Sequence, residues 1–321
     1  MSMSVSGAAS GGGIVLFVMR QPHSTERSTG VRSRLALQAA ALQAAATLWA
    51  ATLYVAAALL AASPVRAADT NWLDIESRIQ YGYFTEDTRS LRNLVEPLNA
   101  GDSHDRLKSY YAGLLAYRLT LLEKAQADQA AAAEAAAAGT PPPKSPPPVR
   151  KNDRTKNEVR QTVERCVGSL DQALEAQSNF ADALALQSAC LGLEAELSSW
   201  RAPLAAPKSA SQLHKALQLA PKNPRVLLLE AIGEYEHAKA PSAAAQHPCA
   251  KFEAVATVFE AERADVDQVP GWGAAEAYVW LGRCYLDNGN GNAARDALER
   301  ALLIAPEFGQ ARRLLATLTS G

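Results

Sequence analysis

The chain has 321 residues, and its 32 lysine and arginine residues balance 33 aspartate and glutamate residues to a net charge of −1. This balance excludes a globally basic protein that would bind nucleic acid or an anionic membrane surface through charge alone. Hydrophobic residues make up 48% of the chain but aromatic residues only 6%, and the abundance of alanine favours closely packed helices.

The N-terminal region has the features of a secretory signal. Several arginines precede an apolar run over residues 35–62, and small residues at 65 and 67 suit a signal peptidase. These arginines are Arg20, Arg27, Arg32 and Arg34. We therefore predict a signal peptide over residues 1–67, read from Met1 or from a start at Met19, and a periplasmic or secreted protein. Because the apolar run is long enough to cross a bilayer, an uncleaved inner-membrane anchor is the alternative.

Helical periodicity begins after the signal. Residues 71–99 predict a helix pair and residues 107–130 predict a long helix. Their buried positions would be Leu91, Leu94, Val95 and Leu98 in the pair, and Tyr110, Leu114 and Tyr117 in the long helix. An alanine-rich run then leads into a proline-rich stretch over residues 140–148, which cannot remain helical. We predict a helical region over 68–124 and a low-complexity insertion over 125–152, which is a solvated polyproline linker or, alternatively, a docking segment for a proline-binding partner.

The region over residues 153–321 alternates helix-forming segments with short turns, at a spacing of about thirty-odd residues per pair. Second helices of such pairs end near Ser178 and at Pro221, and Asn223 opens the next first helix. Shorter insertions over 200–208 and 239–248 are predicted to separate the two helices of a pair. The spacing therefore predicts an array of helix hairpins.

The most complete unit covers residues 275–308. Its pattern consists of Tyr278, Leu281, Gly282 and Tyr285 on a first helix, Ala294, Leu298 and Ala301 on a second helix, and Pro306 after it. Small residues at 282 and 294 would let the two helices cross closely. This unit resembles the tetratricopeptide repeat family, with tyrosine where the family usually has tryptophan and leucine where it usually has an aromatic residue.

The resemblance implies an all-α fold, a right-handed α-solenoid of antiparallel helix hairpins. We expect about five helix pairs and a closing helix over residues 308–318. In this family the first helices line a concave groove that holds a peptide or a helix of another protein. The groove positions implied for this chain are Glu276, Val279, Trp280, Arg283 and Asp287, together with Glu230 and Glu234 of the preceding unit.

Two of these positions also limit the ligand. Members of the family that clamp a C-terminal carboxylate carry lysine, arginine and asparagine in the groove, whereas this chain has Val279 and Trp280 at two such positions, so a different ligand is expected. Trp280 and Arg283 are residue types that often dominate interfaces. The alternative is that Trp280 packs against its neighbouring helix and that the charged residues are solvated.

Four cysteines follow the predicted signal, and an exported protein meets an oxidising compartment. Cys166 and Cys190 are each twelve residues from Ser178, so two antiparallel helices that turn there would bring them to the same height. The midpoint of Cys249 and Cys284 falls in the break over residues 263–273. We predict the disulfides Cys166–Cys190 and Cys249–Cys284, each joining the second helix of one repeat to the first helix of the next. Free buried thiols are the alternative.

Catalytic and metal sites find little support in the sequence. No nucleophile, phosphate loop or cofactor motif is recognised, and Gly271-Trp272-Gly273 lacks the preceding strand of a phosphate-binding turn. His237, His247, Cys249 and Cys284 offer zinc ligand types, but their spacing matches no zinc pattern. We therefore expect no enzyme activity, no cofactor and no metal.

The function predicted is that of a protein-interaction scaffold or adaptor of the bacterial cell envelope. Its partner would be another protein or a peptide, without nucleic acid, and without membrane contact beyond the signal or anchor. An envelope metal-binding protein or enzyme that uses the region from His237 to Cys284 is the alternative, and a self-assembling array is a third. Removal of residues 1–67 takes away five arginines and one glutamate, which changes the net charge from −1 to −5 and leaves a basic ligand as an open alternative.

Overall fold

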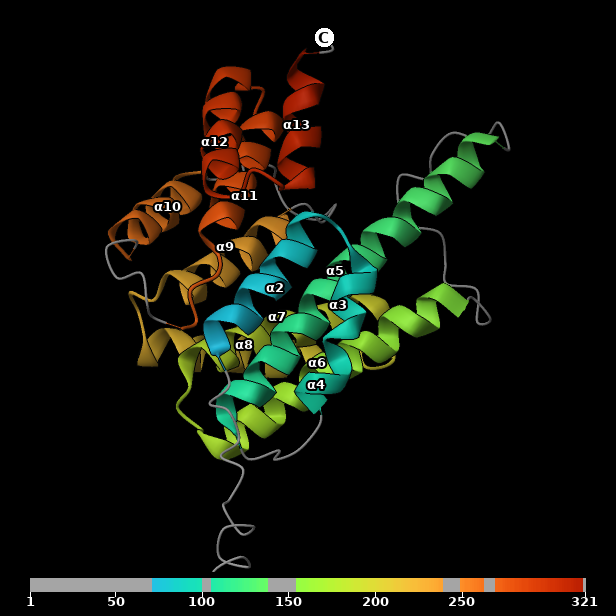
Figure 1. Ribbon diagram of the computed structural model, residues 1–321, viewed down its shortest axis with the longest axis vertical. Coiled ribbons are helices and arrows are strands. Elements are labelled where there is room, and N and C mark those ends of the chain that lie inside the picture. Colours follow the sequence, from blue (N-terminus) through green and yellow to red (C-terminus); the bar gives the residue numbers. More distant parts are fainter. Residues whose placement is uncertain (1–70, 100–104, 138–153, 239–248, 263–268, 320–321) are drawn as a thin grey trace, which may run out of the picture. The chain divides into compact units, whose positions relative to one another are not determined.

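The computed structural model describes residues 71–99, 105–137, 154–238, 249–262 and 269–319 (Figure 1). These segments belong to one compact unit. The predicted signal peptide, the proline-rich stretch and the predicted insertion over 239–248 lie outside the described residues. Within the described ranges, no helix combines the length and the apolar character needed to cross a bilayer.

The described residues are helical and contain no strand. The helices are α2 (Trp72–Phe84), α3 (Thr88–Asn93), α4 (Val95–Asn99), α5 (Arg106–Ala137), α6 (Arg154–Ala176), α7 (Ala181–Leu197), α8 (Ala202–Leu219), α9 (Pro224–Ala238), α10 (Ala250–Glu262), α11 (Ala274–Asp287), α12 (Gly291–Ile304) and α13 (Gly309–Thr319). The all-α fold predicted from the sequence is therefore confirmed.

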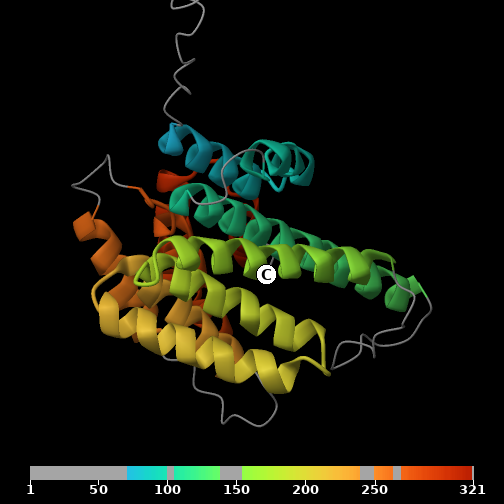
Figure 2. The ribbon, with the colours of Figure 1, turned by 90° about the horizontal axis from the view of Figure 1, so that it is seen from below.

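Successive helices pack as hairpins. α5 packs on α6, α7 on α8, α9 on α10 and α11 on α12, while α2 packs on α3 at the start and α13 packs on α12 at the end. Figure 2 shows α5, α6, α7 and α8 side by side in chain order. This arrangement is a tetratricopeptide-like helical solenoid, and its described part holds the five predicted pairs and the closing helix.

Short polar side chains set the starts of several helices. The side chains of Asn71, Asp87 and Asn290 accept hydrogen bonds from backbone N–H groups in the first turns of α2, α3 and α12. Asp105 does the same for α5, where its carboxylate accepts from the N–H groups of Leu107 at 2.9 Å and of the following residue at 3.3 Å. Such caps satisfy backbone donors that have no partner inside the helix.

The crossing of α11 and α12 follows the predicted packing. A Cβ atom at Gly282 would lie 2.7 Å from Cγ of Leu298 and 3.5 Å from the backbone oxygen of Ala294. The turn between these helices contains Gly289 with φ of +74°, a left-handed conformation that glycine adopts without a steric penalty. The residue types of the repeat are thus explained by close helix contact.

Both predicted disulfides are present. Cys166 of α6 is bonded to Cys190 of α7, and Cys249 is bonded to Cys284 of α11. Each bond joins the second helix of one repeat, or the residue just before it, to the first helix of the next. No free cysteine remains among the described residues.

Two predicted boundaries are wrong. The predicted insertion over 125–152 begins too early, because α5 continues through Ala137 and its alanine-rich end is helical. The predicted insertion over 200–208 is also wrong, since α8 begins at Ala202. Pro203 is compatible with that start because a residue in the first turn needs no N–H for the helix.

The first repeat contacts the closing helix and the residue before it. The rings of Phe84 at the end of α2 and Phe308 before α13 have centroids 4.5 Å apart, and Arg313 Nη1 of α13 lies 2.8 Å from Glu86 Oε2. These contacts join residues more than two hundred positions apart in the sequence. The array therefore closes upon itself at this point, a feature that the repeat pattern did not predict.

Candidate functional site

The first helices α2, α5, α7, α9 and α11 supply the surface on which a tetratricopeptide groove would form, here called the first-helix surface. Two of the predicted groove residues do not lie exposed on it. Val279 is 1% exposed, and Glu276 is 3% exposed and ion-paired with Arg118 of α5. These two residues are buried, so the structure does not offer them as exposed groove positions, and Arg118 of α5 covers the Glu276 carboxylate.

Arg118 lies at the centre of this contact. Its guanidinium carbon is 4.2 Å from the ring centroid of Tyr83 and 4.8 Å from that of Trp272, so the cation lies between two aromatic faces. Burial alone would lower the pKa of Arg118. The nearby Glu276 carboxylate and the tyrosine hydroxyls raise the pKa by more than burial lowers it, so the net shift is upward. The guanidinium is therefore charged and holds α2, α5 and α11 together.

The segment 269–273, which precedes α11, fills the space beside Arg118. The N–H of Gly271 donates to the Glu76 carboxylate of α2 at 3.0 Å, and the Trp272 indole N–H donates to the Tyr110 hydroxyl of α5 at 2.7 Å. Gly273 has φ of +116°, and a Cβ there would lie 2.5 Å from the Phe259 ring. The chain's own residues thus occupy the part of the first-helix surface between α2, α5 and α11.

Glu76 shows the electrostatic consequence of this packing. Burial raises the pKa of its carboxyl, and the hydrogen bonds from Tyr111 at 2.7 Å and from Gly271 offset only part of that rise. Buried carboxyls with raised pKa values are frequent at catalytic sites. Here the hydrogen-bond partners of Glu76 lie in α5 and in segment 269–273, so its observed role is to hold that segment in place.

Trp280 and Arg283 lie next to each other, as their spacing predicted. The Trp280 ring is half-buried, stacks on Phe252 of α10 with centroids 6.2 Å apart, and meets Tyr235 of α9 edge-on at 5.7 Å. The Arg283 guanidinium lies 4.8 Å above the Trp280 ring. Trp280 therefore packs against its neighbouring helices, as the alternative interpretation stated.

The other predicted acidic residues also have partners within the chain. Asp287 accepts a hydrogen bond from the Tyr235 hydroxyl. Glu230 and Glu234 both form ion pairs with Lys251 of α10, at 3.2 Å for Glu230. The predicted residues lie on α9 and α11, several of them have partners within the chain, and their contact with a partner protein stays a prediction.

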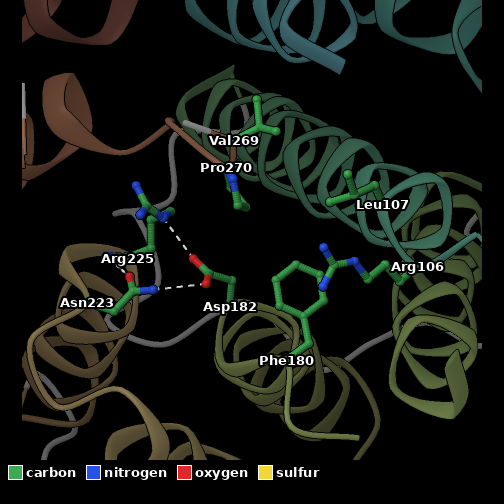
Figure 3. Close-up of a pocket in the computed structure, with 8 residues that line it drawn as sticks. All are labelled: Arg106, Leu107, Phe180, Asp182, Asn223, Arg225, Val269 and Pro270. Carbon is green, nitrogen blue, oxygen red and sulfur yellow. Dashed lines mark hydrogen bonds and ion pairs between the residues drawn. The ribbon is translucent and has the colours of Figure 1, made fainter. Parts of the chain in front are cut away.

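A pocket of about 270 Å³ opens elsewhere on the first-helix surface (Figure 3). It lies at the N-terminal ends of α5, α7 and α9, next to the start of segment 269–273. Its lining residues are Arg106, Leu107, Phe180, Asp182, Asn223, Arg225, Val269 and Pro270. Three successive repeats and the segment before a fourth therefore contribute to one pocket.

One wall of the pocket is a closed network of charges. The Asp182 carboxylate accepts from Arg225 Nε at 2.7 Å on one oxygen and from Asn223 Nδ2 at 2.9 Å on the other. Arg225 also donates through both terminal nitrogens to Glu262, at 2.8 and 2.6 Å. Burial acts to lower the pKa of Arg225, but its bonds to Glu262 and the charge of Asp182 outweigh this effect and raise it. Within this wall one guanidinium is shared by two carboxylates, and every charged group has a partner of opposite charge.

The opposite wall carries Arg106. Its guanidinium carbon lies 5.7 Å from the centroid of Phe180, whose ring is held in turn by Tyr110 with centroids 4.9 Å apart. Arg106 donates to the side-chain oxygen of Gln177 and forms no ion pair with any described residue. This pocket could not be predicted from the sequence, because residues at the starts of separate helices give no signal that they converge.

The fold and the disulfides define a helical repeat protein stabilised between its repeats. Residues 261–318, which include α11, α12 and most of α13, match the family model described as tetratricopeptide repeat. The match confirms the recognition of a tetratricopeptide repeat in this part of the chain and supports a protein of this repeat type. No curated protein matches the chain.

The structure does not offer the two cysteines of the zinc alternative as ligands. Cys249 and Cys284 are joined in a disulfide, and a metal ligand must be a thiolate. His247 lies outside the described residues. In the described part of the chain, no group of three or more histidine, cysteine, aspartate or glutamate side chains is placed to hold a metal ion.

Proposed function

We propose that this tetratricopeptide repeat protein is an interaction scaffold or adaptor of the cell envelope, and that it binds a short segment of another protein without catalysing a reaction. Tetratricopeptide repeats generally bind other proteins, and repeat arrays do so on the surface of their first helices. The partner segment would enter the pocket at the starts of α5, α7 and α9.

One observation carries this proposal: the pocket is open, whereas the surface between α2, α5 and α11 is filled by the chain itself. That surface is occupied by Trp272, Arg118 and Glu276, all of which are buried. The pocket of about 270 Å³ is larger than a cavity of about 150 Å³ that holds a benzene molecule. It therefore has the size of one or two side chains of an extended segment.

An extracytoplasmic location is part of the proposal. Two disulfides suit an oxidising compartment, since thiols in the cytosol are kept reduced. The arginines and the apolar run within residues 20–62 also support export from the cytosol. Retention by an uncleaved anchor would place the repeats in the same compartment.

The proposal is tested by selecting linear peptides from a random library on the immobilised, purified chain. The affinity of the recovered peptides is then measured for the parent chain and for two single-residue variants. Leu107→Trp adds bulk to the pocket wall, whereas Arg283→Glu changes the surface of α11 and leaves the pocket intact. Peptides that lose affinity for the Leu107→Trp variant and keep it for the Arg283→Glu variant support the pocket, and the reverse pattern would return the binding site to Trp280 and Arg283.

A further inference from the structure

We infer that the pocket accepts an acidic side chain, aspartate or glutamate, of the partner segment, and that Arg106 is the residue that pairs with it. This inference rests on the proposed function and specifies its ligand. It depends on the charges, the shape and the apolar surface of the pocket in Figure 3.

One cation of the pocket lining has no carboxylate partner among the described residues. Of the charged lining residues, Asp182 and Arg225 are paired with each other, and Arg225 is paired again with Glu262. The neighbouring acidic residue Asp105 uses its carboxylate to cap α5. Arg106 alone among the lining residues has no oppositely charged partner in the described part of the chain, so the pocket offers a guanidinium to an incoming anion.

A basic ligand would find no comparable partner. Both oxygens of Asp182 already accept hydrogen bonds from Arg225 and Asn223, and both oxygens of Glu262 accept from Arg225. An incoming lysine would have to compete with these short contacts and would lie near Arg106. The net charge of the chain favours cations over long distances. At contact distance, however, Arg106 is the charged group of the pocket that lacks an oppositely charged partner within the described ranges, and it favours an anion.

The helix ends add to this preference. α5, α7 and α9 all begin at the pocket, and the N-terminus of a helix carries a partial positive charge that stabilises anions. Asn223 and Asp105 satisfy part of the free N–H groups of α9 and α5. The helix ends therefore supplement the charge of Arg106 and do not replace it.

The apolar part of the lining fits a side chain better than an inorganic anion. Leu107, Phe180, Val269 and Pro270 surround the space beside Arg106, and they can contact the methylene groups of a glutamate or the neighbouring residue of a peptide. A phosphate group carries close to two charges and is usually bound by several cationic or N–H donors. A single unpaired guanidinium beside apolar walls matches one carboxylate on a carbon chain.

The test uses peptides selected on the full chain, each compared with a matched peptide in which one glutamate is replaced by glutamine. Isothermal titration is carried out with the parent chain, with the variants Arg106→Gln and Arg106→Lys, and with Arg89→Gln as a control arginine that is exposed on α3 and does not line the pocket. The expected result is about tenfold weaker binding of one glutamine peptide to the parent chain, a value typical of one charge-assisted hydrogen bond.

The same comparison separates this inference from the proposed function. The preference for glutamate should vanish in Arg106→Gln, persist in Arg106→Lys and be unchanged in Arg89→Gln. Peptides that bind through the pocket with equal affinity in their glutamate and glutamine forms would overturn the acidic ligand and leave the proposed function standing. Failure to select any peptide would overturn both. If free phosphate displaces the peptide at a concentration at which free glutamate has no effect, the pocket would be assigned to phosphate instead.

Discussion

Removal of the buried cation that joins α2, α5 and α11 is the most informative perturbation of this fold. In Arg118→Met the methionine keeps contact with the rings of Tyr83 and Trp272, but Glu276 is left as a carboxylate without its partner at a position that is 3% exposed. Breaking a buried ion pair by removing one partner costs about 3–5 kcal/mol. We expect a loss of stability in that range.

The double variant Arg118→Met with Glu276→Leu removes both charges and should recover most of this loss, since an apolar pair of similar volume often replaces a buried ion pair without cost. Urea unfolding with intact disulfides, followed by circular dichroism and tryptophan fluorescence, gives the free energies of unfolding. The coupling free energy between Arg118 and Glu276 is then obtained from the parent chain, the two single variants and the double variant. A cost below about 1 kcal/mol for Arg118→Met, or strictly additive effects, would refute the role assigned to this pair.

Three further predictions concern the repeats. Replacing Cys166 and Cys190, which are separated by 24 residues, with serine should lower the free energy of unfolding by about 3 kcal/mol, and intact-mass analysis should show that oxidation of the fully reduced parent chain removes four hydrogens. Gly282→Ala should destabilise by about 1–3 kcal/mol through overpacking, whereas Gly168→Ala, which meets nothing within 4 Å in α6, should stabilise; equal effects in urea unfolding would contradict the close crossing. Because burial raises the pKa of Glu76 above its ordinary 4.5, its contribution to stability should be complete below pH 4.5 and should fade as the pH rises through the raised pKa. The free energy of unfolding, measured as the pH rises through this range, should therefore fall less steeply for Glu76→Gln than for the parent chain. Parallel curves of the two proteins against pH would count against the raised pKa.

The parts of the fold that sequence reasoning predicted correctly are those that depend on local spacing. Gly282, Leu298 and Pro306 lie at fixed intervals within one unit, so the hairpin of α11 and α12 could be recognised from the sequence. The disulfide between Cys166 and Cys190 was also predictable, because two antiparallel helices bring residues at equal distance from their turn to the same height. Boundaries were less certain, since the alanine-rich end of α5 and the start of α8 at Ala202 have compositions that also suit loops.

Contacts between distant parts of the chain could not be predicted in this way. Arg118 and Glu276 are 158 residues apart, and nothing in either local pattern indicates that they meet. Glu276 and Val279 were predicted to lie in an open groove because the first helices of this family line one. In this chain both residues are buried, and the partner of Glu276 is Arg118 of a distant helix.

The pocket illustrates the same limit. Asn223 was recognised as the start of a first helix, but its hydrogen bond to Asp182 and the convergence of both with Arg106 depend on how three repeats stack. Charged residues near helix starts are common. Whether such a residue is free to bind a ligand is known only when its ion-pair partners in the folded chain are identified. Three-dimensional packing therefore supplied the site, while the sequence supplied the units that build it.

Amide hydrogen exchange of the full chain, with and without a selected peptide, tests the location of the binding site most directly. The account predicts slower exchange at the starts of α5, α7 and α9, with little change in the middle of α11 around Trp280 and Arg283. Slower exchange confined to α11, with no change at the starts of α5, α7 and α9, would contradict it.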